Sequence, residues 1–128
     1  MAGLPRKFFR YSHSPGKPAV ADGRAFPSKP RGVFAYYDVP GALEDRSRYA
    51  ADRPVLQRLL LTTDKVLDAR RGSTSADAPV FWAWVSDDKF ETDPDGMRRA
   101  LTRMGYEALL LDGEAVFMSA RAFRVVGS

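Results

Sequence analysis

The chain is organised around Gly105-Tyr-Glu-Ala-Leu-Leu-Leu-Asp-Gly-Glu-Ala-Val-Phe-Met-Ser-Ala-Arg-Ala-Phe-Arg-Val-Val126, a segment that predicts two apolar strands joined by a tight turn. The dipeptide Asp112-Gly113 favours a two-residue hairpin turn between them. Glu114 follows that turn directly and opens the second strand. Burying an unpaired carboxylate is costly, so Glu114 is the first candidate for chemistry. The alternative is that it points to solvent from the end of the hairpin.

Length and composition limit the class of protein. A chain of 128 residues predicts one domain, residues 1–128, and we expect a monomer. No run approaches the ~18 apolar residues of a membrane helix, and the start lacks the apolar core of a signal peptide, so we expect no membrane contact. We expect the protein to act in the cytoplasm, either of the cell that makes it or of a target cell into which it is delivered. With no cysteine and one histidine, we expect no disulfide and no metal site. Catalysis would then use carboxylates, hydroxyls and one imidazole.

The net charge of +4 is unevenly distributed. Residues 1–31 hold seven Lys or Arg against one Asp, which is +6, and the other 97 residues hold 13 basic and 15 acidic groups, which is −2. This basic arm, with its Pro/Gly-rich loop over 14–31, predicts a surface for phosphates or for an acidic protein. A solvated basic tail is the alternative.

Local signals predict an α+β domain of six or seven strands with mainly antiparallel pairing and about two helices. Pro94 after Asp93 marks the start of the second helix, and Gly105 marks its end. The first helix is expected from Asp38 to Ala51. Strands are expected at 8–13, 32–37, 55–61 with a continuation to 66–68, 80–85, and on both sides of the Asp112-Gly113 turn. The 80–85 run is expected to be a central strand, with Trp82 and Trp84 in the core.

Several segments, in order, resemble small ADP-ribosyltransferases of the diphtheria-toxin and poly(ADP-ribose) polymerase type. Tyr11-Ser12-His13-Ser14 resembles the Tyr-His-Gly-Thr/Ser segment of that family's first strand. Gly32-Val33-Phe34-Ala35 and Arg48-Tyr49-Ala50 resemble its Gly-Ile-Tyr-Phe strand and its Ala-x-Tyr helix, and Glu114 completes a His-Tyr-Glu set. The serines around His13 and the phenylalanine at 34 depart from the pattern.

The resemblance implies a split mixed sheet and transfer of ADP-ribose from NAD to a macromolecular acceptor. It implies Glu114, His13 and Tyr49 as the catalytic set, and it implies that NAD is held by Arg10, Ser12, Phe34, Tyr36 and Tyr49. Either Arg10 or His13 would hold the NAD ribose. A host protein is the expected acceptor, with nucleic acid less favoured, as for toxins and phage factors that disable host proteins, including anti-CRISPR transferases.

The chemistry of NAD cleavage calls for these residue types. Breaking the bond between nicotinamide and ribose passes through an oxocarbenium-like state, and a carboxylate on the ribose 2-hydroxyl stabilises that charge as it develops. The cationic nicotinamide ring suits aromatic faces such as those of Tyr49 and Phe34. Each residue has a structural alternative, since strand aromatics such as Tyr36 and Tyr37 are commonly core residues.

Two other classes of function stay open from the sequence. One is a non-catalytic protein-binding module, either a regulatory protein that uses the basic arm or a degenerate transferase. The other is a nucleic-acid binder in which Phe8, Phe9 and Tyr11 stack on bases beside the basic arm. No Gly-x-Gly-x-x-Gly or Gly-Lys-Ser/Thr segment is present, so a Rossmann site or a P-loop is not indicated.

Overall fold

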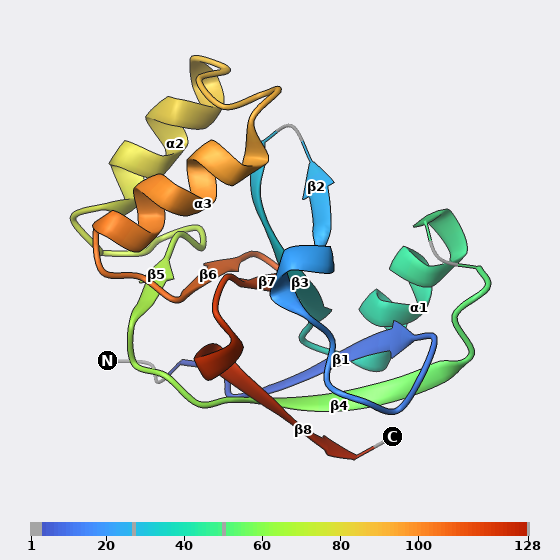
Figure 1. Ribbon diagram of the computed structural model, residues 1–128. Helices are drawn as coiled ribbons and strands as arrows, with labels where there is room; N and C mark the ends of the chain where they lie inside the picture. The colour runs from blue at the N-terminus through green and yellow to red at the C-terminus, as the bar shows by residue number, and fades with distance from the viewer. Residues whose placement is uncertain (1–3, 27, 50, 128) are drawn as a thin grey trace.

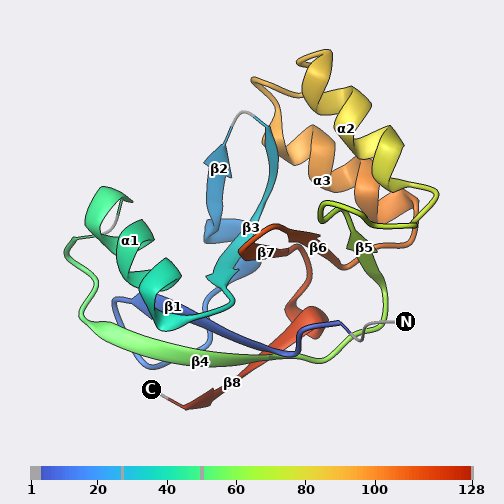
Figure 2. The same cartoon turned by 180° about the vertical axis from the view of Figure 1, so that it is seen from behind.

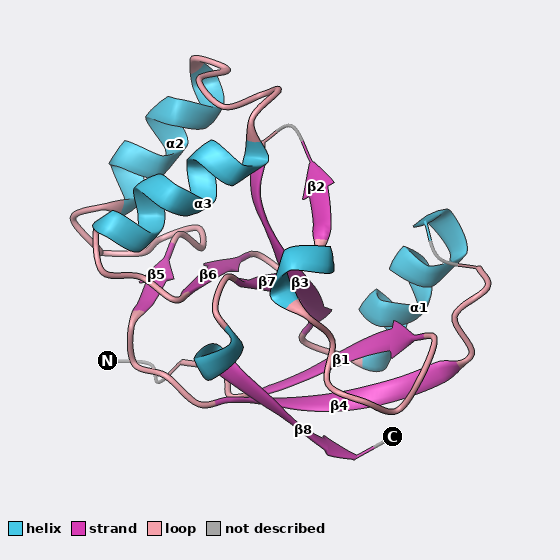
Figure 3. Ribbon diagram, viewed as in Figure 1, coloured by secondary structure: helices cyan, strands magenta, loops and turns pink. Residues whose placement is uncertain are grey.

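The structure, a computed structural model, describes residues 4–26, 28–49 and 51–127. Within these ranges the chain forms eight β-strands, three α-helices and two short 3₁₀ helices (Figures 1 and 3). Their bounds in chain order are β1 (Lys7–Ser12), η1 (Val20–Asp22), β2 (Arg24–Phe26), β3 (Lys29–Tyr36), α1 (Val39–Tyr49), β4 (Val55–Leu61), β5 (Val66–Asp68), α2 (Ala78–Ser86), α3 (Pro94–Arg103), β6 (Ala108–Leu111), β7 (Glu114–Phe117), η2 (Ala120–Ala122) and β8 (Phe123–Gly127).

The strands form one curled mixed sheet in the order β5-β6-β7-β3-β1-β4-β8, with β2 paired to β3 beside this path. Among the strands of the described ranges, only β5 and β6 run parallel, so the predicted α+β class and the mainly antiparallel pairing are confirmed. The sheet is weakly joined in its middle, because Phe9 opposite Tyr36 is the one pair in register between β1 and β3 in the described chain. The sheet therefore has two parts, β5-β6-β7-β3 and β1-β4-β8.

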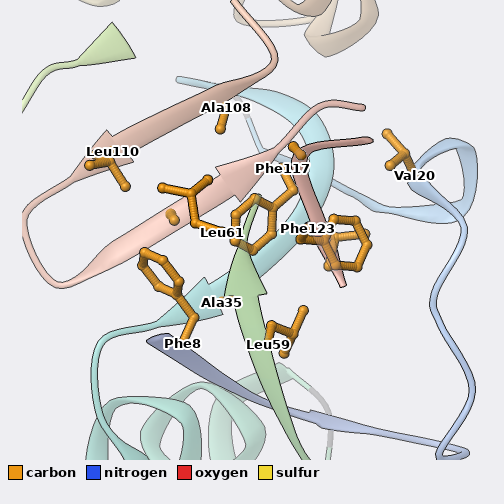
Figure 4. Packing of buried hydrophobic residues seen from close by; sticks show 12 residues of the cluster. Phe8, Val20, Ala35, Leu59, Leu61, Ala108, Leu110, Phe117 and Phe123 are labelled. Carbon is orange, nitrogen blue, oxygen red and sulfur yellow. The ribbon is translucent and has the colours of Figure 1, made fainter. Parts of the chain in front are cut away.

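The β6–β7 hairpin is buried on both faces and organises the core. Asp112 and Gly113 form its turn, as predicted, and Gly113 adopts φ +81°, which glycine accepts without strain. Leu110 and Phe117 pack on one face against Phe8, Leu59 and Phe123 of the β1-β4-β8 part (Figure 4). The residues that alternate with them face α2 and α3 instead: Leu109, Leu111 and Val116. The β1-β4-β8 part of the sheet and the pair of helices α2 and α3 thus enclose the hairpin from its two faces.

The predicted strand over 80–85 is wrong, because this segment is helix α2. Phe81 is 1% exposed and packs with Ala78 and Val85, which share its helix face, while Trp82 is 45% exposed. The expectation that both tryptophans lie in the core therefore fails for Trp82, and Trp84 is half-buried. α2 lies beside α3 against the β5-β6-β7 part, whereas α1 stands on the other side of β2 and β3 (Figures 1 and 2).

The two other helices agree with their predictions, apart from small shifts at their ends. The Asp93 side chain caps α3 by accepting from the Gly96 backbone N–H at 2.9 Å, and Asp38 does the same for α1 with Gly41 at 2.7 Å. The first helix was expected to run to Ala51, whereas α1 ends at Tyr49 and Ala51 is in a turn. Ala50 lies outside the described residues.

Three further expectations for the strands need correction. The segment 14–31 is not a plain loop, because Arg24 and Phe26 pair with Gly32 and Lys29 to make a hairpin with the extended β3. The strand after the turn is interrupted after Phe117, where η2 intervenes before β8 crosses to pair with β4. β5 is not a continuation of β4, because it pairs with β6 at the opposite edge of the sheet.

Candidate functional site

A cavity of about 370 Å³ opens between α1, the β2–β3 hairpin and the β6–β7 turn. Charged and aromatic side chains make up most of its wall. The lining residues are Phe26, Lys29, Tyr36, Gly41, Glu44, Asp45, Arg48, Tyr49, Asp112, Gly113 and Glu114. Gly41 allows α1 to approach the sheet, because a Cβ there would lie 3.0 Å from the Asp38 carboxylate and 3.3 Å from the Tyr36 Cβ.

Glu114 is the first residue of β7 and lies opposite Tyr36 of β3 in the sheet. Its side chain is only 15% exposed, so it does not project into bulk solvent as the alternative from sequence would have it. The Lys29 ammonium forms an ion pair with one carboxylate oxygen of Glu114. A partly buried carboxylate with one oxygen bonded has its other oxygen available to a second donor.

Aromatic rings form a cluster beside this carboxylate. The Phe26 ring packs edge-on against Tyr49 at 5.4 Å and against Phe34 at 5.2 Å between centroids. Two cations of the chain lie over these rings: Lys29 Nζ is 5.5 Å from the Phe26 centroid, and Arg24 Cζ is 5.8 Å from the Tyr49 centroid. The cavity is therefore built to hold positive charge against aromatic faces.

A hydrogen-bonded network of Arg24, Asp45 and Tyr36 supports this wall. Arg24 reaches both oxygens of Asp45, one of them at 2.7 Å, and the Tyr36 hydroxyl donates to Asp45 at 2.6 Å. Burial acts to raise the pKa of Asp45, but the hydrogen bonds from Arg24 and Tyr36 outweigh it and hold the pKa below its ordinary value. Burial and the bond to Asp45 raise the pKa of Tyr36 well above its usual range, so its phenol stays a donor.

No protein-family model, no curated protein and no solved structure matches this chain. In the described ranges, no three His, Asp or Glu side chains lie close enough together to hold a metal ion. Among the helices of those ranges, none has the length and apolar character needed to cross a bilayer.

The structure brings together three of the residues predicted for the site. Glu114, Tyr36 and Tyr49 all line the cavity, although they come from β7, β3 and α1. Phe34 is buried directly behind it, at 2% exposure, against Phe26. Tyr37 is not part of the site: its hydroxyl donates to the Leu111 carbonyl at 2.6 Å and its ring packs on Phe8.

His13 lies outside this cavity, so the expectation that it shares a cleft with Glu114 is not met. It follows the last residue of β1, its side chain is 62% exposed, and Nδ1 lies 3.9 Å from an Asp52 carboxylate oxygen. The physical reason is that β1 ends at Ser12, and Ser14-Pro15-Gly16 then turns the chain away. Ser12 itself is buried at the end of β1 and does not line the cavity.

Arg10 is also outside the cavity lining, but it lies in the buried region next to it. Its Nη1 donates to Gln57 at 3.1 Å, and its Nε is buried without a hydrogen-bond partner among the described residues. Burial, followed by the charges of Arg53 and Arg24, lowers the pKa of Arg10 to about 10. Asp45 and Tyr36 act in the opposite direction, which places Arg10 within electrostatic reach of the cavity wall.

The sequence did not single out Lys29, Asp45 or Phe26. For Asp45 a signal exists, because it lies four residues before Tyr49 on a predicted helix, and residues at this spacing share a face. Lys29 and Phe26 lie in the segment expected to be a loop, where no periodicity of the sequence indicates which way a side chain points. Their position follows only from the β2–β3 pairing.

Proposed function

We propose that this protein is an NAD-dependent mono-ADP-ribosyltransferase with an ADP-ribosyltransferase-like split sheet, acting on a macromolecular acceptor such as a host protein. One observation carries the proposal. Glu114, a partly buried carboxylate at the start of a strand, lines a cavity together with the rings of Phe26, Tyr36 and Tyr49. Carboxylate and aromatic faces are the two kinds of group that cleavage of the nicotinamide to ribose bond requires.

In the proposed reaction, the bond between ribose C1′ and the nicotinamide nitrogen breaks, and its electron pair leaves with neutral nicotinamide. A nucleophilic oxygen or nitrogen of the acceptor bonds to C1′, and the acceptor proton goes to a carboxylate or to water. Glu114 accepts a hydrogen bond from the ribose 2-hydroxyl and stabilises the positive charge that develops at C1′. This interaction strengthens toward the transition state, so it lowers the barrier rather than only tightening binding.

The aromatic cluster supplies the binding part of the proposal. Tyr49 is 58% exposed at the cavity wall and offers a ring face to the nicotinamide cation. Arg10, the alternative to His13 for the ribose in the sequence prediction, also lies outside the cavity lining, and its Nε is buried, so Arg10 makes no direct contact with NAD in this version of the site. His13 takes no part in this version of the site.

The experiment that tests the proposal is transfer of label from NAD carrying a radioactive adenylate phosphate to proteins of a bacterial or eukaryotic lysate. We expect a labelled band with the wild-type protein and none with Glu114→Gln. A chelator and a reductant are expected to leave the band unchanged, because the proposed chemistry uses neither a metal nor a thiol. Absence of any labelled macromolecule together with absence of nicotinamide release would contradict it.

The placement of His13 favours a second candidate, a non-catalytic protein-binding module with a degenerate transferase fold. A site without the imidazole keeps the cavity but lacks one member of the His-Tyr-Glu set. This candidate predicts no nicotinamide release and no heat of NAD binding by calorimetry, with retained binding to a protein partner.

A further inference from the structure

In the structure, most of the positive charge of the N-terminal arm is not free to bind a partner. Most basic residues of 1–31 are bonded inside the molecule: Arg24 to Asp45, Lys29 to Glu114, and Arg31 to Asp95 at 2.9 Å. Lys17 donates to the carbonyls of Ala120 in η2 and of Phe123 at the start of β8. The basic arm is therefore not a free polyanion site.

A groove of about 520 Å³ on the other side of the molecule carries free positive charge instead. One wall of the groove is the C-terminal half of α3. The other walls are the residues just before β5, those just before β6, and the segment that leads into η2. In the part of the chain that the structure describes, five cationic side chains line it against the single carboxylate of Glu107; they are Lys65, Arg98, Arg99, Arg103 and Arg121. It is at the far end of the β6–β7 hairpin from Glu114, since Ala108 pairs with Phe117 and Leu111 with Glu114.

Carboxylates compensate these cations only in part. Lys65 and Arg103 are exposed and form no ion pair with any described residue. Arg98, Arg99 and Arg121 each have an ion-pair partner, at 3.9 Å from Asp95, 3.5 Å from Asp93 and 3.3 Å from Glu107. Like charges held in one groove repel each other, so an anionic ligand that neutralises them gains binding free energy.

The backbone of the groove indicates what kind of anion fits. The N–H groups of Tyr106, Glu107 and Met118 already donate to carbonyls of Leu101, Lys65 and Glu107. These three main-chain donors are therefore not available to an extended acidic peptide. The groove instead offers guanidinium groups, whose geometry suits phosphate oxygens. It also offers the half-buried ring of Tyr106, which is held in the wall because its hydroxyl is hydrogen-bonded to Asp77.

We infer that this groove, lined by Lys65, Arg98, Arg99, Arg103, Tyr106 and Arg121, binds single-stranded nucleic acid through its phosphates, with Tyr106 contacting a base. The inference does not depend on the proposed transferase activity, because none of these residues lines the cavity of Glu114. Neutralising about four phosphates makes the affinity fall roughly fifty-fold from about 50 to about 200 mM salt.

The test is fluorescence anisotropy of a labelled twelve-nucleotide strand of mixed sequence, as RNA and as DNA, with the full chain. The double variant Lys65→Glu/Arg103→Glu is expected to lower affinity at least tenfold at low salt. The matched control is Lys7→Glu/Arg124→Glu, which makes the same charge change at exposed positions of β1 and β8 and is expected to bind within about twofold of wild type. Circular dichroism confirms that both variants are folded.

The inference is overturned if the wild type does not bind the strand, or if both double variants lose affinity equally, because binding would then follow net charge alone. A poly-glutamate chain of the same charge that displaces the strand at equal concentration also overturns it, in favour of an acidic protein partner. Tyr106→Ala is expected to weaken binding several-fold without changing the salt dependence, because a ring contact releases no counterion.

Discussion

The ammonium of Lys29 and the carboxylate of Glu114 form an ion pair inside the cavity between α1 and the sheet, although 85 positions separate them in the chain. The same ammonium lies 5.5 Å from the Phe26 ring centroid and 5.8 Å from that of Phe34. Lys29 thus contacts the carboxylate that the proposed reaction assigns to the ribose and lies over Phe26, one of the aromatic rings that line the cavity.

We expect Lys29→Met to lower the KM for NAD roughly three- to tenfold, because the ammonium no longer competes for the rings and for Glu114. Steady-state nicotinamide release measures this change. Lys17→Met is the matched control, since Lys17 lies 4.7 Å over the Phe123 ring, outside the cavity, and its loss is expected to leave KM unchanged. A higher KM for Lys29→Met would show instead that Lys29 binds NAD directly.

Tyr49→Ala is expected to raise the KM for NAD roughly five- to tenfold while turnover changes less, because a stacking face contributes to substrate and transition state alike. Tyr49→Phe keeps the ring and is expected to behave like wild type. Both values come from the same nicotinamide-release assay. A fall in turnover with unchanged KM would assign Tyr49 to the chemical step.

Asp45 is expected to make stability depend on pH. Its folded pKa lies below that of the unfolded chain, so its contribution is present above about pH 4 and is lost as the pH falls through the folded pKa. Asp45→Asn should lower the free energy of unfolding at neutral pH by on the order of 3 kcal/mol, because it leaves the mostly buried Arg24 uncompensated.

Urea unfolding between about pH 7 and pH 2.5 checks this expectation. Acidification should lower the free energy of unfolding less in Asp45→Asn than in wild type. Asp64→Asn is the control, because this carboxylate is 90% exposed in its pair with Arg6 and should change stability by less than about 1 kcal/mol. Equal acid sensitivity of wild type and Asp45→Asn would refute the role given to the network.

The assignment of residues 78–86 as a helix makes a separate prediction about stability. Phe81→Ala is expected to lower the free energy of unfolding by about 3 to 5 kcal/mol, because Phe81 is 1% exposed and fills the core beneath α2. Trp82→Ala should cost much less, since that side chain is 45% exposed. Chemical denaturation of the two variants measures the difference. A larger loss for Trp82→Ala would match the strand predicted from the sequence instead.

Elements with strong local punctuation are predictable from this sequence. Asp93-Pro94 and Gly105 frame α3, and Asp112-Gly113 fixes the hairpin, because capping and turn preferences act over a few residues. The run from Ala78 to Val85 has no polar residue, so neither a period of two nor one of 3.6 stands out, and the helix is indicated only by Pro79 near its start.

The candidate site is predictable in part for the same reason. Glu114 follows a recognisable turn, and Tyr49 lies on a recognisable helix, so both can be proposed from local patterns. The positions of Lys29 and His13 depend on long-range pairing: β2 folds back on β3 and brings Lys29 to Glu114, whereas β1 ends before His13 and leaves it in solvent. No local signal carries that information.

The decisive experiment for the proposed transferase activity measures release of nicotinamide from NAD by purified wild type and Glu114→Gln, together with calorimetric binding of NAD to both proteins. We predict that Glu114→Gln lowers turnover by roughly a hundredfold or more and leaves the Kd for NAD within about threefold of wild type, because Glu114 acts mainly in the transition state. Glu114→Gln with full turnover, or wild type that neither binds nor cleaves NAD, would contradict the assignment of this cavity as an ADP-ribosyltransferase site.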